Sequence, residues 1–163
     1  MGEAVSWPTL AIWLSTSRCN LACAYCYTSG RLRGRELSTE EALGMVSELA
    51  ELGVVHLAIT GGEPFTRPDV LRVAREAVDH GLKVSFNTNG TLIDERMARE
   101  LRALEAFVFV SLDGPDRAVC DALRGRGTWR RTLRGVAELR SYGVEFSLIM
   151  AITALSHRQG RGH

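Results

Sequence analysis

The sequence has no long apolar run and no excess of either charge. No window approaches the roughly 18 consecutive apolar residues that a membrane-spanning helix requires. Lysine plus arginine (20) nearly equal aspartate plus glutamate (19), and the net charge of +1 gives no electrostatic reason to expect nucleic acid or a membrane as a partner. The N-terminus carries Glu3 and lacks the apolar stretch of a signal peptide, so we expect a cytoplasmic protein.

Cysteine is scarce and unevenly distributed. Three of the four cysteines lie within Cys19–Cys26, whereas Cys120 stands alone in a helical-looking stretch, where we expect a buried structural side chain. The reducing cytosol would keep the clustered residues as thiols or metal ligands rather than disulfides. Structural zinc takes four protein ligands, commonly in two separated pairs, and the sequence has no second pair and no histidine near the first. A zinc site or a fortuitous cluster is therefore the weaker alternative.

Short β-rich runs alternate with amphipathic helical stretches, and glycine, proline or a capping residue marks each switch. The expected strands are Leu10–Thr16, Val54–Thr60, Leu82–Asn87, Ala106–Leu112 and Val144–Ile152. The four main connecting helices are expected to begin at the capping box Ser38–Glu41, at Arg67–Asp69, at Asp94 and at Thr128, and to end near Gly53, Gly81, Glu105 and Ser141. This pattern predicts one α/β domain, either a doubly wound sheet or part of a (β/α) barrel, because a full barrel needs about 250 residues.

Unusual segments follow four successive strands of this expected sheet. They are Cys19–Cys26, Thr60–Pro64, Asn87–Gly90 and Ser111–Gly114. In both architectures the ligand site lies at the carboxyl ends of the strands, so the four segments are expected to form one shared site. Taken alone, Ser111–Gly114 is also typical of an ordinary turn, and Thr60–Pro64 of a turn that starts a helix.

Three thiols on a short loop suit an iron-sulfur cluster. Leu21 and Tyr25 are among the apolar residues that surround the thiols, and such surroundings lower the local dielectric and limit the access of water. Three cysteines on a 4Fe-4S cluster leave one iron open for a small molecule.

Cys-x3-Cys-x2-Cys with an aromatic residue before the last cysteine resembles the cluster motif of the radical S-adenosylmethionine (radical SAM) superfamily. The Gly-Gly-Glu-Pro segment ending at Pro64 is similar to the family's GGEP segment, and the NTNG and SLDG segments stand where the family has theirs. The resemblance covers about residues 10–150. It implies a partial (β/α) barrel, with about five parallel strands and outer helices in this chain. It also implies that a 4Fe-4S cluster is held by Cys19, Cys23 and Cys26 and that S-adenosylmethionine chelates the open iron.

The resemblance also assigns contacts with S-adenosylmethionine, and it assigns no catalytic side chain. Tyr25 would lie near the adenine, and the strand end at Gly61, Gly62 and Glu63 would meet the methionine ammonium through its carbonyl groups. The remaining contacts, with the ribose, the methionine part or the substrate, fall to Asn87 (or Thr88), Ser111 and Asp113.

The chemistry implied is one-electron reductive cleavage of S-adenosylmethionine to a 5'-deoxyadenosyl radical, which abstracts hydrogen from a substrate. The implied partners are an electron donor such as ferredoxin or flavodoxin and a peptide or small-molecule substrate, because the chain looks most similar to peptide-modifying and cofactor-maturing members.

We expect residues 1–152 to form an incomplete core barrel and residues 153–163, which lack apolar periodicity, to form a disordered tail. The barrel's last strands are expected to be missing. The alternative function is a non-catalytic iron-sulfur-binding module or a fragment of a longer maturase.

Overall fold

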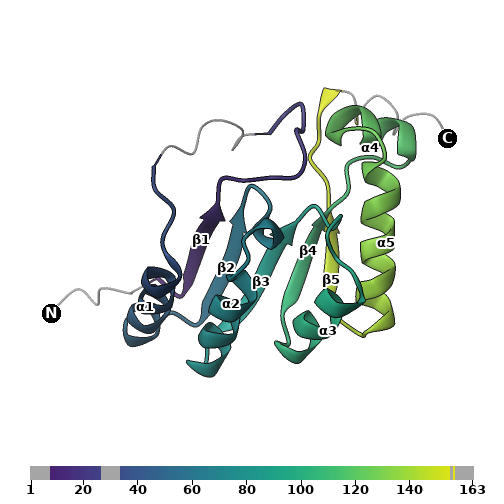
Figure 1. The fold of residues 1–163 in the computed structure, drawn as a ribbon. Helices are drawn as coiled ribbons and strands as arrows, with labels where there is room; N and C mark the ends of the chain where they lie inside the picture. Colours follow the sequence, from purple (N-terminus) through teal and green to yellow (C-terminus); the bar gives the residue numbers. More distant parts are fainter. Residues whose placement is uncertain (1–7, 27–33, 155, 157–163) are drawn as a thin grey trace, which may run out of the picture.

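The computed structural model describes residues 8–26, 34–154 and 156, which form a single parallel sheet flanked by helices (Figure 1). The strands pair in chain order and are β1 Leu10–Thr16, β2 His56–Gly61, β3 Lys83–Thr88, β4 Phe107–Ser111 and β5 Phe146–Ile149. The helices are α1 Thr39–Glu51, α2 Val70–Asp79, α3 Glu95–Ala103, α4 Arg117–Arg124 and α5 Thr128–Ser141, with a 3-10 turn, η1, at Pro64–Thr66. The predicted α/β fold with five parallel strands is confirmed.

The helices cover one face of the sheet and leave the other open. Figure 1 shows α1, α2 and α3 in a row over the covered face. Leu57, Phe86 and other side chains on this face are fully buried in the core. On β1, alternate side chains point the other way, and Leu10, Ile12 and Leu14 are 48%, 65% and 46% exposed. Among the described residues, no helix covers this second face, which corresponds to the inner face of a partial barrel.

The predicted start and end of α1 are both present. Ser38 accepts a hydrogen bond from the backbone N–H of Glu41, and the Glu41 side chain accepts one from the backbone of Ser38. Gly53, just past the helix, has φ +82°, a left-handed conformation that glycine adopts without strain. These local signals explain why the boundaries of α1 could be predicted from the sequence.

Two elements depart from the four main helices and five strands that the sequence predicts: the helical-looking stretch around Cys120 is a helix of its own, and the last strand is shorter. Residues 117–124 form a separate helix, α4, whose N-cap Asp116 accepts a hydrogen bond from Val119 N. The last strand, β5, spans four residues instead of the nine expected. Cys120, on α4, is fully buried as predicted.

Most of the predicted tail, namely residue 155 and residues 157–163, lies outside the described residues. Of the described tail residues, Thr153 donates its backbone N–H to Ser156 Oγ at 2.8 Å. No helix within the described ranges is long and apolar enough to cross a membrane.

Candidate cofactor site

The four predicted segments meet at the carboxyl edge of the sheet, around a cavity of about 200 Å³. Eight of the ten predicted site residues line it: Cys19, Cys23, Tyr25, Cys26, Gly61, Gly62, Asn87 and Ser111. Thr88, the alternative to Asn87, lines it too. Glu63 and Asp113 do not. A larger cavity, of about 560 Å³, lies at the opposite strand ends and contains none of the predicted residues.

The three thiols share the cavity wall without converging on one point. Cys19 is exposed, and Cys23 and Cys26 are half-buried. Within the described ranges, no three His, Cys, Asp or Glu side chains are grouped closely enough to hold one metal ion. Zinc needs its ligands around a single ion, whereas the thiolates of a 4Fe-4S cluster each bind a different iron. The donor set therefore fits a cluster better than a single ion.

Burial raises the pKa of the Cys19 and Cys23 thiols above the ordinary value. The backbone N–H of Leu21 opposes this effect at Cys19, because it donates to Sγ at 3.4 Å. At Cys23 the opposing group is the Arg124 guanidinium. Binding of iron by these thiols must therefore release their protons.

Gly61 and Gly62 lie directly against the chain that leaves β1. The Gly62 N–H donates to Thr16 O at 2.7 Å. A Cβ atom at Gly61 would lie 2.4 Å from Thr16 O, and one at Gly62 would lie 2.2 Å from Arg18 O. Gly61 also has φ +137°. Both glycines are thus required by the close approach of two backbones, in addition to any contact with a ligand.

Glu63 is fully buried, and its carboxylate faces the protein. Oε1 accepts from Thr88 Oγ1 at 2.7 Å and from Phe65 N at 3.3 Å, and Oε2 accepts from Asn89 N at 2.8 Å. Burial raises the pKa of Glu63, although all three donors oppose the shift. The side chain therefore joins the end of β2 to the turn after β3.

Asn89, which the sequence prediction did not single out, links this turn to the cysteine loop. Its Nδ2 donates to Asn20 Oδ1 at 2.9 Å and approaches Cys19 Sγ at 4.0 Å. Its Oδ1 accepts from the backbone N–H of Thr91 at 2.9 Å, which fixes the orientation of the amide. The NTNG pattern could have identified Asn89, because it is the second of the two asparagines in that motif.

Asp113 is also fully buried, behind the cavity wall. Oδ2 accepts from Tyr25 Oη and from Arg124 Nε, the latter at 2.5 Å, and Oδ1 accepts from Ala151 N at 2.7 Å. The backbone N–H of Ala24 also donates to Leu123 O, at 2.9 Å. Asp113 therefore ties the cysteine loop to α4 and to the chain after β5.

Arg124 is the second residue that sequence reasoning missed. Its side chain is 9% exposed, lines the cavity and lies over the Tyr25 ring with 5.9 Å between Cζ and the centroid. Among the described residues that line this cavity, it is the one cation. Recognising residues 117–124 as a separate helix would have drawn attention to the charge at its end.

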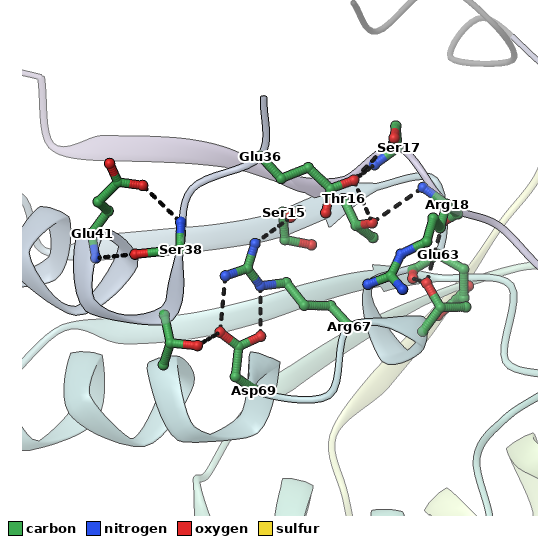
Figure 2. Close-up of polar contacts among 12 residues, drawn as sticks. Ser15, Thr16, Ser17, Arg18, Glu36, Ser38, Glu41, Glu63, Arg67 and Asp69 are labelled. Atoms are coloured by element: carbon green, nitrogen blue, oxygen red, sulfur yellow. Dashed lines mark hydrogen bonds and ion pairs between the residues drawn. The ribbon is translucent and has the colours of Figure 1, made fainter. Parts of the chain in front are cut away.

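A buried arginine holds the end of β1, and Figure 2 shows its contacts with Ser15 and Asp69. Arg67 pairs with both carboxylate oxygens of Asp69, at 2.7 and 2.9 Å, and donates to Ser15 O at 3.0 Å. Its guanidinium also lies 5.0 Å from the centroid of the Trp13 ring. The end of β1 is thus attached to the segment that follows η1.

The fold and the site together define an α/β partial-barrel protein with a three-cysteine cavity at its strand ends. The model of the Radical SAM superfamily matches residues 13–158. The chain belongs to the radical SAM superfamily.

Curated relatives are similar in sequence to most of this chain. The AdoMet-dependent heme synthase of Methanosarcina barkeri is 39% identical over 145 residues, which are 86% of this chain and 42% of the relative. The mycofactocin maturase MftC of Mycolicibacterium smegmatis is 37% identical over 147 residues, which are 89% of this chain and 38% of the relative. The chain thus spans about two fifths of the length of these relatives.

Solved structures show the same architecture. Native anSMEcpe with bound AdoMet superimposes with a TM-score of 0.81 at 26% identity, over 93% of this chain and 45% of that one. Streptococcus suis SuiB bound to its precursor peptide SuiA also has a TM-score of 0.81, over 94% of this chain and 35% of that one. At 20% identity, SuiB supports the fold alone.

Proposed function

We propose that this chain is the cluster-binding part of a radical SAM enzyme, in which Cys19, Cys23 and Cys26 hold a 4Fe-4S cluster and S-adenosylmethionine binds at the open iron. The observation that carries the proposal is the meeting of these thiols with Gly61, Gly62, Asn87 and Ser111 around one cavity. When bound, the two cofactors supply a 5'-deoxyadenosyl radical by one-electron reductive cleavage, and this radical abstracts hydrogen from a substrate.

The residues of the cavity would hold the organic cofactor by complementary chemistry. The backbone carbonyls at Gly61 and Gly62 suit an ammonium group, because no side chain screens them. Arg124 suits a carboxylate, since a guanidinium pairs with carboxylates in a fixed geometry. Tyr25 and Leu21 offer apolar surface to an adenine and restrict the access of water, and Asn87 and Ser111 offer hydrogen bonds to hydroxyl groups.

Partners and domain limits follow from the same proposal. A ferredoxin or flavodoxin in the cytoplasm would supply the electron. The substrate class is a peptide or a cofactor precursor, supported by relatives that are a heme synthase and a mycofactocin maturase. Residues 1–152 would form the core unit and residues 153–163 a tail outside it, with the function belonging to maturation of a peptide or cofactor.

The test is anaerobic reconstitution with iron and sulfide, followed by reduction in the presence of S-adenosylmethionine. We expect about four irons per chain and 5'-deoxyadenosine as a product. Replacing Cys19, Cys23 or Cys26 by alanine should abolish stable cluster binding. Cys120→Ala is the matched control and should keep the cluster, because Cys120 is buried in α4 away from the cavity wall. Iron binding that survives all three loop substitutions would overturn the proposal.

A second candidate is a module that binds the cluster without turnover. It is supported by the exposure of Leu10, Ile12 and Leu14 in the described part of the chain, because radical chemistry requires a site closed to water. A stable cluster combined with no 5'-deoxyadenosine would favour this second function for the chain.

A further inference from the structure

The chain that enters the cysteine loop is bound by a carboxylate from the segment that precedes α1. A single oxygen of Glu36, Oε1, accepts from Thr16 Oγ1 at 2.9 Å, from Ser17 N at 2.8 Å and from Ser17 Oγ at 2.9 Å. Figure 2 shows these donors gathered around the Glu36 carboxylate. Glu36 stands ten residues after Cys26, so the contact joins the two sides of the loop at its base.

The same segment is held from the opposite side by the end of β2. The N–H groups of Gly62 and Glu63 donate to Thr16 O at 2.7 Å and to Arg18 O at 2.8 Å. Thr16 Oγ1, which donates to Glu36, also accepts from the backbone N–H of Arg18 at 3.1 Å. Residues 16–18 are therefore fixed between β2 and Glu36, and the next residue is Cys19.

The contacts favour the ionised form of Glu36. The backbone N–H of Ser17 is the largest cause that holds the pKa of Glu36 below the ordinary value, and the two hydroxyl groups act in the same direction. Hydrogen bonds to a charged acceptor are stronger than those between neutral groups. Oε1 of Glu36 accepts three such hydrogen bonds, so removal of this carboxylate releases Thr16 and Ser17 from the segment that precedes α1.

We propose that Glu36 is a positioning residue that sets the direction in which Cys19 enters the cavity, and so the geometry of the cluster. The inference rests on the proposed function, since it concerns the same site. Glu36 is not among the residues that line the cavity. Its effect is transmitted through the backbone of Thr16 and Ser17.

The experiment compares three variants in the full chain. Glu36→Ala removes all three acceptor contacts, and Glu36→Gln keeps a side-chain oxygen but loses the charge. Glu40→Gln, four residues further along, is the matched control because it changes the same charge at the start of α1 and leaves the loop base intact.

Two measurements are made on each protein. The first, on the metal-free chain, is amide hydrogen exchange at Ser17 together with the thermal unfolding midpoint. The second, after reconstitution, is the rate at which a chelator removes iron from the cluster. In Glu36→Ala we expect both Ser17 exchange and iron loss to be about tenfold faster, which corresponds to the loss of one net charge-assisted hydrogen bond. Both rates in Glu36→Gln should lie between those of Glu36→Ala and those of the unmodified chain. Both rates in Glu40→Gln should equal those of the unmodified chain.

The outcomes separate a positioning role of Glu36 from a merely structural one, and separate failure of that role from failure of the proposed function. Faster iron loss at an unchanged unfolding midpoint supports a positioning role, because a merely structural role would lower the midpoint in proportion. Unchanged Ser17 exchange, or unchanged iron loss in Glu36→Ala, overturns the inference while the proposed function stands. If the unmodified chain takes up no cluster, the proposed function fails and the role of Glu36 fails with it, whatever the exchange at Ser17.

Discussion

The carboxylate of Glu63 and the backbone of Asn89 are joined across two strand ends, with 2.8 Å between Oε2 and N. This contact brings the GGEP and NTNG segments together from within the protein. Through Asn89, whose amide approaches Cys19 Sγ, it connects the buried core to the cysteine loop. The glutamate of the GGEP segment therefore organises the site from behind instead of lining it.

Removal of Glu63 should destabilise the fold strongly. Glu63→Ala leaves three donors, on Phe65, Thr88 and Asn89, without an acceptor and opens a buried cavity. We expect a loss of about 3 kcal/mol in the free energy of unfolding. Glu63→Gln should cost less, because the amide keeps one acceptor oxygen. Some loss should remain, because its NH2 group would face the N–H donor of Asn89. Urea denaturation of the metal-free chain measures both.

Glu51→Gln serves as the control for this series, since Glu51 is exposed at the end of α1 and its neutralisation should change stability by less than about 0.5 kcal/mol. If Glu63→Ala unfolded at the same urea concentration as Glu51→Gln, the internal role of Glu63 would be wrong.

The glycines should respond to alanine in opposite directions. At Gly61 and Gly62 the new Cβ would lie 2.4 and 2.2 Å from backbone oxygens, so the strand end or the loop must move. At Gly44, in α1, a Cβ meets nothing within 4 Å. We expect Gly44→Ala to stabilise the chain by up to about 1 kcal/mol through helix propensity. Gly61→Ala and Gly62→Ala should each cost about 2 kcal/mol or more. Thermal unfolding compares the three, and equal midpoints for Gly44→Ala and Gly62→Ala would contradict the described close approach.

Most of the fold could be predicted because its signals are local. The capping box at Ser38, the left-handed Gly53 and the apolar run at β4 each act within a few residues, and the strand ends followed from them. The stretch around Cys120 is helical-looking in the sequence but is not among the four main helices predicted, because α4 has only eight residues, between Asp116 and Gly125. Its independence depends on packing against the rest of the chain.

The directions of the buried acids could not be predicted in the same way. Whether Glu63 and Asp113 face the cavity or the protein depends on which donors approach them from other strands, and no pattern in either motif records this. Glu36 gave no signal at all, since its partners lie twenty residues earlier in the chain. Long-range polar contacts of this kind are set by the tertiary fold, which sequence periodicity does not encode.

The start of α1 should lose stability at low pH in a defined range. The Arg35 guanidinium, followed by the backbone N–H of Ser38, lowers the pKa of Glu41 to about 2. Because the folded-state pKa is depressed, the contribution of Glu41 is fully present above its ordinary pKa of 4.5 and is lost as pH falls toward 2. NMR titration of the Glu41 side chain checks this. Arg35→Gln should move the midpoint upward toward the ordinary value, and a midpoint unchanged by that substitution would show that Arg35 is not the cause.

Asp113 and Arg124 should behave as a coupled pair. Arg124→Met leaves Asp113 buried with its charge unopposed, and we expect a loss of about 3 kcal/mol in unfolding free energy. Asp113→Asn in the same chain should recover part of this loss, because the neutral amide no longer needs a cation. Tyr25→Phe removes only one donor and should cost about 1 kcal/mol.

A double-mutant cycle by urea denaturation gives the coupling energy, and additive losses for Asp113→Asn and Arg124→Met would show that the 2.5 Å contact contributes nothing to the fold. Arg124→Met should also weaken S-adenosylmethionine binding in the reconstituted chain more than Tyr25→Phe does, since the arginine is the cation on the cavity wall.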